Sequence, residues 1–130
     1  MTNVTLVVAI VPAKDRADSV GATVRALRGL PQVGRVLVVD DGSTDRTAAE
    51  ALAAGAEVLR LPSNRGKSGA VAAGVAACPA ADVFLLIDAD LGGTAAAADR
   101  LLEPVLADQA DLVVGVLPAG RRRSGLGSVR

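Results

Sequence analysis

The chain has 130 residues, 14 acidic and 14 basic side chains, no histidine and one cysteine. This length suits a single compact domain, and the 51% hydrophobic content, with Phe84 as the only aromatic residue, favours a core of small aliphatic side chains. Without histidine or a second cysteine, the chain cannot build a Cys/His zinc site, an internal disulfide, or a Ser-His-Asp or Cys-His catalytic group.

Charge is unevenly distributed along the chain. All 14 acidic residues lie at or before Asp111, whereas four arginines fall within the last ten positions. We interpret residues 117–130 as a flexible basic tail, because this segment is rich in glycine and arginine and has no periodicity. No basic stripe interleaved with aromatic residues runs through the rest of the chain, so we expect no nucleic-acid partner.

No apolar run reaches the roughly 18 residues of a membrane span. The first residues also lack the basic region and the small-residue cleavage site of a signal peptide. We therefore expect a cytoplasmic protein.

Short β-branched runs alternate with alanine-rich stretches along residues 1–116. The predicted strands are 4–11, 35–40, 56–61, 82–88 and 111–116, and the predicted helices are 17–28, 45–54, 67–77 and 95–107. The strands are apolar almost throughout, which is typical of strands covered on both faces. The alternation predicts an α/β fold over residues 1–116, with a doubly wound, mostly parallel, Rossmann-like sheet in three α/β/α layers. Thr44 and Thr94 are predicted to cap the second and fourth helices.

The loops that follow the strands are the candidate site, because ligands of open α/β sheets bind beyond the carboxyl ends of the strands. In chain order these loops read VPAKDRADS, DDGSTDRT, PSNRGKSGA and DADLGGT. Acidic residues follow the second and fourth strands, whereas Arg65 and Lys67 follow the third. Carboxylates beside a cationic loop suit a phosphate that is held through a metal ion.

Asp88 and Asp90 are the candidate metal ligands. Residues i and i+2 of an extended chain point the same way and lie roughly 6 to 7 Å apart, at about 3.3 Å per residue. Two such carboxylates can share one Mg²⁺ or Mn²⁺, whose shell substrate phosphates complete. Gly92 and Gly93 would let a ligand approach the backbone. The alternative is that both acids only favour the start of the next helix.

Two further loops carry specific patterns. In VVDDGSTDRT a buried strand ends in Asp40 and Asp41, and Gly42 permits a tight turn, although an ordinary strand–turn–helix is the alternative. NRGKSGA is not a phosphate-binding P-loop, since that pattern needs glycine where Leu61 stands. Lys67 and the nearby Arg65 are still candidates for a phosphate contact, with a solvated charge at the helix start as the alternative.

Taken together, these loops resemble the family 2 glycosyltransferases of the A-type (GT-A) fold, including the polyprenyl-phosphate sugar synthases. The matching segments are IVPA at 10–13, VLVVDDGSTDRT at 36–47, NRGKSGA at 64–70, FLLIDADL at 84–91 and ADLVVG at 110–115. The resemblance covers nearly the whole chain, and it rests on the order and spacing of all five segments.

The resemblance implies a site for a nucleotide-diphosphate sugar, with UDP or GDP as the nucleotide. Pro12 and Ala13 would line the nucleotide pocket, and Asp41 would face the base with Asp40 beside it. A Mg²⁺ or Mn²⁺ ion held by the two later aspartates would stabilise the leaving diphosphate. The candidate binding residues are Pro12, Ala13, Asp15, Asp40, Asp41, Gly42, Arg65, Gly66, Lys67, Asp88, Ala89 and Asp90, of which Asp88 and Asp90 are the metal ligands.

The chain departs from the family pattern in two places. Where the family usually continues its first loop as Pro-Ala-Tyr-Asn-Glu, residues 12–16 read Pro-Ala-Lys-Asp-Arg, so an aromatic and an acidic residue that help to hold the nucleotide are replaced. Family members also continue beyond the fifth strand into a region with the acceptor site and, in inverting enzymes, the general base. We therefore expect the donor-binding part of a glycosyltransferase, whose full activity needs further segments or a partner chain.

The sequence contains fewer indications of the acceptor than of the donor. Arginines in the tail would suit an anionic acceptor such as polyprenyl phosphate, and with it peripheral association with a membrane. An exposed sheet edge or apolar face left by a missing half would favour a homo-oligomer.

Two alternative functions stay open. FLLIDADLGGT also resembles the D-x-D-G-T signature of haloacid-dehalogenase-like phosphotransferases, in which the first aspartate, here Asp88, is the nucleophile. Leu91 interrupts that match, and no lysine and acid pair follows Asp111. A non-catalytic nucleotide-sugar-binding protein would keep the same donor loops.

Overall fold

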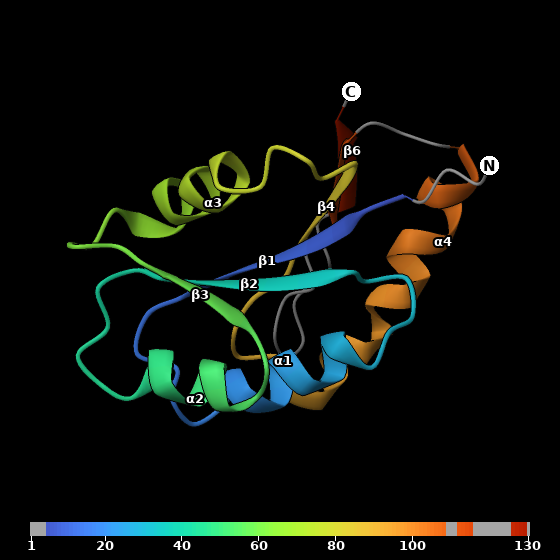
Figure 1. Cartoon of the computed structure of the whole chain (residues 1–130). Coiled ribbons are helices and arrows are strands. Elements are labelled where there is room, and N and C mark those ends of the chain that lie inside the picture. Colours follow the sequence, from blue (N-terminus) through green and yellow to red (C-terminus); the bar gives the residue numbers. More distant parts are fainter. Residues whose placement is uncertain (1–4, 109–111, 116–125, 130) are drawn as a thin grey trace.

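The computed structural model of the chain, shown in Figure 1, describes residues 5–108, 112–115 and 126–129. Its main sheet has the strand order β3-β2-β1-β4, and every neighbouring pair is parallel. The strands are β1 (Val7–Ala13), β2 (Arg35–Asp40), β3 (Glu57–Arg60) and β4 (Val83–Leu86). The predicted parallel α/β fold is therefore confirmed, with four strands in the sheet.

Helices cover both faces of the sheet (Figure 1). One face carries α1 (Val20–Arg28), α2 (Thr47–Ala53), the 3-10 helix η1 (Gly92–Ala98) and α4 (Asp99–Asp108). The opposite face carries α3 (Gly66–Ala76). The molecule thus has the three expected α/β/α layers. Right-handed crossovers put α1 and α2 on one face while the chain runs from β1 through β2 to β3, and put α3 on the other face when the chain returns to β4. No helix within the described ranges is long and apolar enough to cross a membrane.

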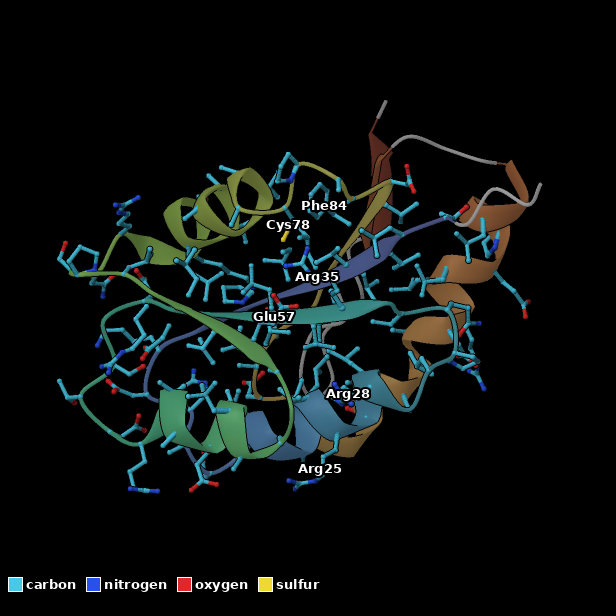
Figure 2. All side chains as sticks on the ribbon, in the orientation of Figure 1. Arg25, Arg28, Arg35, Glu57, Cys78 and Phe84 are labelled. Atoms are coloured by element: carbon cyan, nitrogen blue, oxygen red, sulfur yellow. The ribbon has the colours of Figure 1, made fainter. Side chains whose placement is uncertain are left out.

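Alternate residues of β1 pack into two separate cores, as the period of two in a strand requires. Val7, Ala9 and Val11 join the cluster that contains the buried face of α1. Val8 and Ile10 join the cluster beneath α3, which also contains the cysteine and the phenylalanine labelled in Figure 2. Both faces of the strand are buried, which explains its continuous apolar sequence.

Helix α3 packs very close to the sheet because of a glycine. A Cβ atom on Gly74 would lie 2.9 Å from the Cγ2 atoms of both Ile10 and Val39. Such contacts are shorter than van der Waals packing allows, so the position requires glycine. The close packing brings the first turn of α3, with Lys67, over the carboxyl end of the sheet.

The predicted helix caps were wrong. Helix α2 begins at Thr47, and its first amide is capped by the carboxylate of Asp45, which accepts the N–H of Thr47 at 2.9 Å. Thr44 instead donates its amide to Asp15 Oδ1 at 2.8 Å, a contact between two loops. Thr94 lies inside η1, which begins at Gly92. At α2 the carboxylate of Asp45 therefore takes the capping role, while Thr44 is engaged in a contact between loops.

The predicted tail also differs from the structure in part. Residues 126–129 form a strand, β6 (Leu126–Val129), which pairs antiparallel with β5 (Leu112–Gly115). The fifth predicted strand therefore exists, but it hydrogen-bonds to this later segment in a sheet of its own. Pairing satisfies backbone groups that an isolated strand would leave open. The rest of the predicted tail, including Arg121, Arg122 and Arg123, lies outside the described residues.

Candidate functional site

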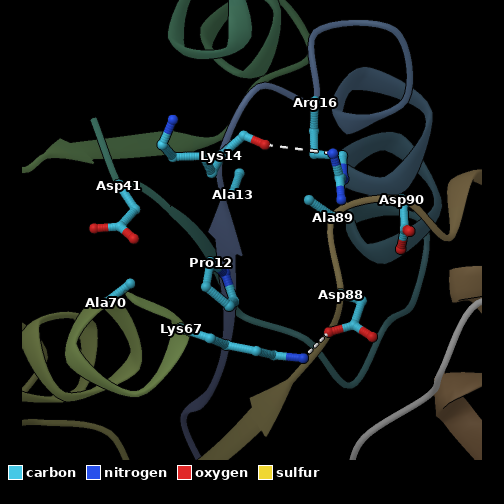
Figure 3. Close-up of a pocket in the computed structure, with 10 residues that line it drawn as sticks. All are labelled: Pro12, Ala13, Lys14, Arg16, Asp41, Lys67, Ala70, Asp88, Ala89 and Asp90. Atoms are coloured by element: carbon cyan, nitrogen blue, oxygen red, sulfur yellow. Dashed lines mark hydrogen bonds and ion pairs between the residues drawn. The ribbon is translucent and has the colours of Figure 1, made fainter. Parts of the chain in front are cut away.

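An open cavity of about 260 Å³ lies at the carboxyl edge of the sheet, where the loops after β1, β2 and β4 meet the first turn of α3 (Figure 3). This is the edge at which ligands of α/β sheets bind. The lining residues are Pro12, Ala13, Lys14, Arg16, Asp41, Lys67, Ala70, Asp88, Ala89 and Asp90. The structure therefore gathers predicted residues from the end of β1, the loops after β2 and β4 and the first turn of α3 around one space.

Asp88 and Asp90 lie in the turn that follows β4. The strand ends at Leu86, so the two acids are not part of an extended segment as the sequence predicted. They nevertheless both line the cavity, as Figure 3 shows. The side chain of Asp88 is 22% exposed and forms an ion pair with Lys67. The side chain of Asp90 is exposed.

Helix α1 holds this turn through buried polar contacts. Thr23 Oγ1 donates to the carbonyl oxygen of Ala89 at 2.7 Å and accepts the N–H of Gly92 at 2.8 Å. Ser19 Oγ adds a longer contact of 3.3 Å to the same carbonyl. Sequence reasoning missed Thr23. The available signal was its position on the apolar face of α1, where a hydroxyl needs a partner.

Asp41 connects the second and third loops at the cavity. Its N–H donates to the carbonyl oxygen of Ala13 at 2.9 Å, and its Oδ1 accepts the N–H of Arg65 at 2.7 Å. The next residue, Gly42, has φ +79°, and a Cβ there would lie 3.1 Å from the amide nitrogen of Asn64. Glycine therefore allows the two loops to approach and to place Asp41 at the cavity wall.

Asp40 lies away from the cavity, although it is the neighbour of Asp41. It is 1% exposed, and its Oδ1 accepts the N–H of Ser43 at 2.9 Å. Its Oδ2 lies 3.4 Å from Nε of Arg60. Successive residues at a strand end point in opposite directions, so only one of the two acids can face the cavity.

Asp15 also lies outside the cavity and joins the first loop to the second. Its backbone has φ +54°, its N–H donates to Ser43 Oγ at 2.9 Å, and its Oδ1 accepts the N–H of Thr44 at 2.8 Å. The bond from Thr44, followed by the ammonium of Lys14 at 3.1 Å, lowers the pKa of the Asp15 carboxyl below its ordinary value. The Asp15 carboxylate therefore links the first loop to the second by a hydrogen bond.

The remaining candidates, Arg65 and Gly66, lie where the loop after β3 enters α3. The side chain of Arg65 and the glycine that follows it do not line the cavity. Gly66 has φ +79°, and its N–H donates to Asn64 Oδ1 at 2.8 Å. These residues shape the loop that presents Lys67.

The cavity wall contains two cations that sequence reasoning did not select, Lys14 and Arg16. They stand at positions where the chain departs from the usual first-loop pattern of the family. With Lys67 they balance the three aspartates of the wall. Such a mixed wall can bind a phosphate group and a divalent cation together.

The donor set suits a hard divalent cation. Within the described residues, no group of three or more His, Cys, Asp or Glu side chains is placed to hold a metal ion. Asp88 and Asp90 therefore offer carboxylate oxygens without completing a coordination shell. Mg²⁺ is commonly bound by one or two carboxylates plus substrate phosphates and water, so these residues fit such an ion.

A family model described as glycosyl transferase family 2 matches residues 8–128. The chain is 32% identical over 110 residues to the uncharacterized protein MJ1222 of Methanocaldococcus jannaschii, covering 82% of this chain and 44% of that protein. It is 33% identical over 91 residues to glucosyl-3-phosphoglycerate synthase of Mycolicibacterium paratuberculosis, covering 63% and 27% respectively. The chain thus spans less than half the length of these relatives.

Solved structures show the same similarity. The crystal structure of M. tuberculosis glucosyl-3-phosphoglycerate synthase superposes with a TM-score of 0.70 at 27% identity, over 78% of this chain and 41% of that chain. The same synthase in complex with Mn²⁺, UDP-glucose and phosphoglyceric acid gives a TM-score of 0.69 at 26% identity, over 78% and 39%.

Proposed function

Since the chain belongs to glycosyl transferase family 2, we propose that it is the donor-binding part of a glycosyltransferase that uses a nucleotide-diphosphate sugar and Mg²⁺ or Mn²⁺. The observation that carries this proposal is the convergence of Asp41, Lys67 and the Asp88–Asp90 turn on one cavity at the carboxyl edge of the sheet. Base, phosphate and metal each have a chemically suitable partner there.

The nucleotide is proposed to be UDP. Similar synthase structures contain UDP with Mn²⁺ or Mg²⁺, which supports this choice. One oxygen of the Asp41 carboxylate accepts the N–H of Arg65, and the other can accept an N–H of the base at the cavity wall. Pro12 and Ala13 supply an apolar surface beside it.

The diphosphate is proposed to lie between the cations and the aspartate turn. Lys67, Lys14 and Arg16 are all at the wall and can contact phosphate oxygens. Asp88 and Asp90 would hold the divalent cation, which when bound offsets the negative charge that develops on the leaving diphosphate. Lys67 would exchange its carboxylate partner for a phosphate oxygen when the donor binds.

We propose an acceptor that carries an anionic group. Synthase structures similar to this chain contain phosphoglyceric acid, which supports a small phosphorylated acceptor over a lipid phosphate. The described residues are assigned only to the donor side. Transfer to the acceptor is a property proposed for the whole protein.

Calorimetric titration tests the donor site. We would titrate the native chain with UDP, GDP and UDP-glucose, with and without Mn²⁺, and repeat the titrations with Asp90→Asn. Glu103→Gln is the matched control, because it makes the same chemical change at an exposed residue of α4 that does not line the cavity.

We expect Mn²⁺-dependent binding of UDP to the native chain and to Glu103→Gln, and its loss in Asp90→Asn. Circular dichroism would establish that each protein is folded. A folded native chain that binds none of these nucleotides in the presence of Mn²⁺ would contradict the proposed function.

A further inference from the structure

Thr23 is a buried hydroxyl on an otherwise apolar helix face. It is 0% exposed, between Val20, Val24 and Leu27 of the same face of α1. A buried hydroxyl without a partner is costly, so its contacts indicate what the residue is for. The two shortest of those contacts lie outside α1, although Ala89 belongs to the same apolar core as the helix. They reach the turn after β4, which is 66 residues further along the chain at the Ala89 contact.

The two contacts of Thr23 enclose Asp90. The carbonyl of Ala89 belongs to the peptide group that precedes Asp90, and Thr23 Oγ1 donates to it at 2.7 Å. The amide of Gly92 lies two residues after Asp90 and donates to the same oxygen at 2.8 Å. Both distances are those of well-formed hydrogen bonds. One hydroxyl thus bridges the backbone on both sides of a candidate metal ligand.

The usual local role of a helical threonine does not account for this geometry. Threonine hydroxyls in helices often donate to the carbonyl four residues earlier, and Thr23 Oγ1 lies 3.1 Å from the carbonyl oxygen of Ser19. A hydroxyl has only one proton to donate. The shorter contact to Ala89 therefore takes it. The bond accepted from Gly92 has no counterpart in the local role.

Asp90 depends on its backbone for its direction. Among the described residues, no hydrogen bond or ion pair is made by its carboxylate, and its side chain is exposed. Asp88, in contrast, is held by Lys67. The backbone of residues 89–92 therefore determines whether the two carboxylates can face one ion. Thr23 of α1 holds this backbone through two hydrogen bonds.

We propose that Thr23 is the positioning residue of the metal-binding turn. Its hydroxyl fixes the backbone on both sides of Asp90 so that this carboxylate and that of Asp88 face the same divalent cation. The inference rests on the proposed function for its assignment of Asp88 and Asp90 as metal ligands. Groups that orient metal ligands typically contribute 10- to 100-fold to metal affinity.

The variants Thr23→Val and Thr23→Ser separate the hydroxyl from the shape of the side chain. Valine keeps the volume and removes both hydrogen bonds, whereas serine keeps the hydroxyl. Electron paramagnetic resonance of unbound Mn²⁺ would give the metal affinity of each variant, with and without UDP. We expect Thr23→Val to bind Mn²⁺ about 10- to 100-fold more weakly than the native chain and Thr23→Ser to retain its affinity.

Val24→Ala controls for a general loss of stability. Val24 is the next residue of α1, is 0% exposed and belongs to the same core. Its truncation removes core packing but leaves both hydrogen bonds of Thr23 to the turn in place, so Mn²⁺ affinity should be unchanged at a temperature where every variant is folded. A native-like Mn²⁺ affinity in Thr23→Val, or an equal loss in Val24→Ala, would overturn the inference.

Amide hydrogen exchange of Gly92 gives a readout that needs no ligand. We expect faster exchange in Thr23→Val and native exchange in Thr23→Ser, because only the first loses the acceptor of this amide. Unchanged Gly92 exchange in Thr23→Val would overturn the inference even if the native chain bound Mn²⁺. A native chain that binds neither Mn²⁺ nor UDP would instead refute the proposed function, with Gly92 exchange still reporting whether Thr23 holds the turn.

Discussion

The ammonium of Lys67, in the first turn of α3, forms an ion pair with Oδ1 of Asp88, in the turn after β4. Figure 3 shows this pair at the wall of the cavity. A side-chain cation therefore occupies an oxygen of a candidate metal ligand. A divalent cation and Lys67 would therefore compete for that oxygen. A bound diphosphate would offer Lys67 another partner.

Lys67→Met should change the two binding steps in opposite directions. Without nucleotide, Mn²⁺ affinity should rise by about two- to fivefold, since removal of a partly exposed pair changes the free energy by less than about 1 kcal/mol. In the presence of Mn²⁺, UDP affinity should fall because the phosphates lose a cationic partner. Calorimetry measures both. Arg100→Met, on the exposed surface of α4, is the matched control and should change neither. Parallel losses of both affinities would contradict the competition.

Asp15→Asn should weaken UDP binding although Asp15 does not line the cavity. The carboxylate joins the first loop to the second by accepting the N–H of Thr44, and the neutral amide is a poorer acceptor. Calorimetry with UDP and Mn²⁺ would measure the change. Asp18→Asn, three residues along at an exposed position, is the control. Equal UDP affinity in the native chain and Asp15→Asn would refute the role of this hydrogen bond between the loops.

Gly74→Ala should lower the free energy of unfolding by about 1 to 3 kcal/mol, the usual range for overpacking a core. The added Cβ would meet methyl groups of Ile10 and Val39 at 2.9 Å. Urea denaturation gives the difference from the native chain. Gly93→Ala is the matched control, because nothing lies within 4 Å of its added Cβ. Unchanged stability in Gly74→Ala would mean that α3 can move away from the sheet without cost.

The ion pair between Arg35 and Glu57 should make stability depend on pH. Arg35 donates Nε and Nη2 to the two carboxylate oxygens at 2.8 and 2.7 Å, and these bonds lower the pKa of Glu57 below its ordinary value of 4.5 (Figure 2). The contribution of a carboxylate with a lowered pKa is present above the unfolded value and is lost as the pH falls through the folded value.

The difference in unfolding free energy between the native chain and Glu57→Gln should therefore shrink as the pH falls below about 4.5. Urea denaturation of both proteins from neutral to acidic pH measures this difference. The effect should be small, because the pair is partly exposed. A difference that is constant across this range would show that the pair contributes nothing.

Much of the fold could be predicted from local patterns in the sequence. The apolar runs of β1 and β2 show that both faces of these strands are buried, and the alternation with helices then permits few topologies. The Asp88–Ala89–Asp90 segment and the residues around Asp41 could be recognised as a candidate binding site. Their assembly at one sheet edge follows because parallel strands all end at that edge.

Only the tertiary structure decided which of these residues reach the cavity. Asp40 and Asp41 are indistinguishable by type, yet the first is buried against Ser43 and the second borders the cavity. Thr23 acquires its role from contacts with a turn more than 60 residues away. Helices and strands can be predicted from the spacing of apolar residues over a few neighbouring positions. A site depends on side-chain direction and on contacts between distant loops, which are defined only when the sheet register and helix packing bring those loops together.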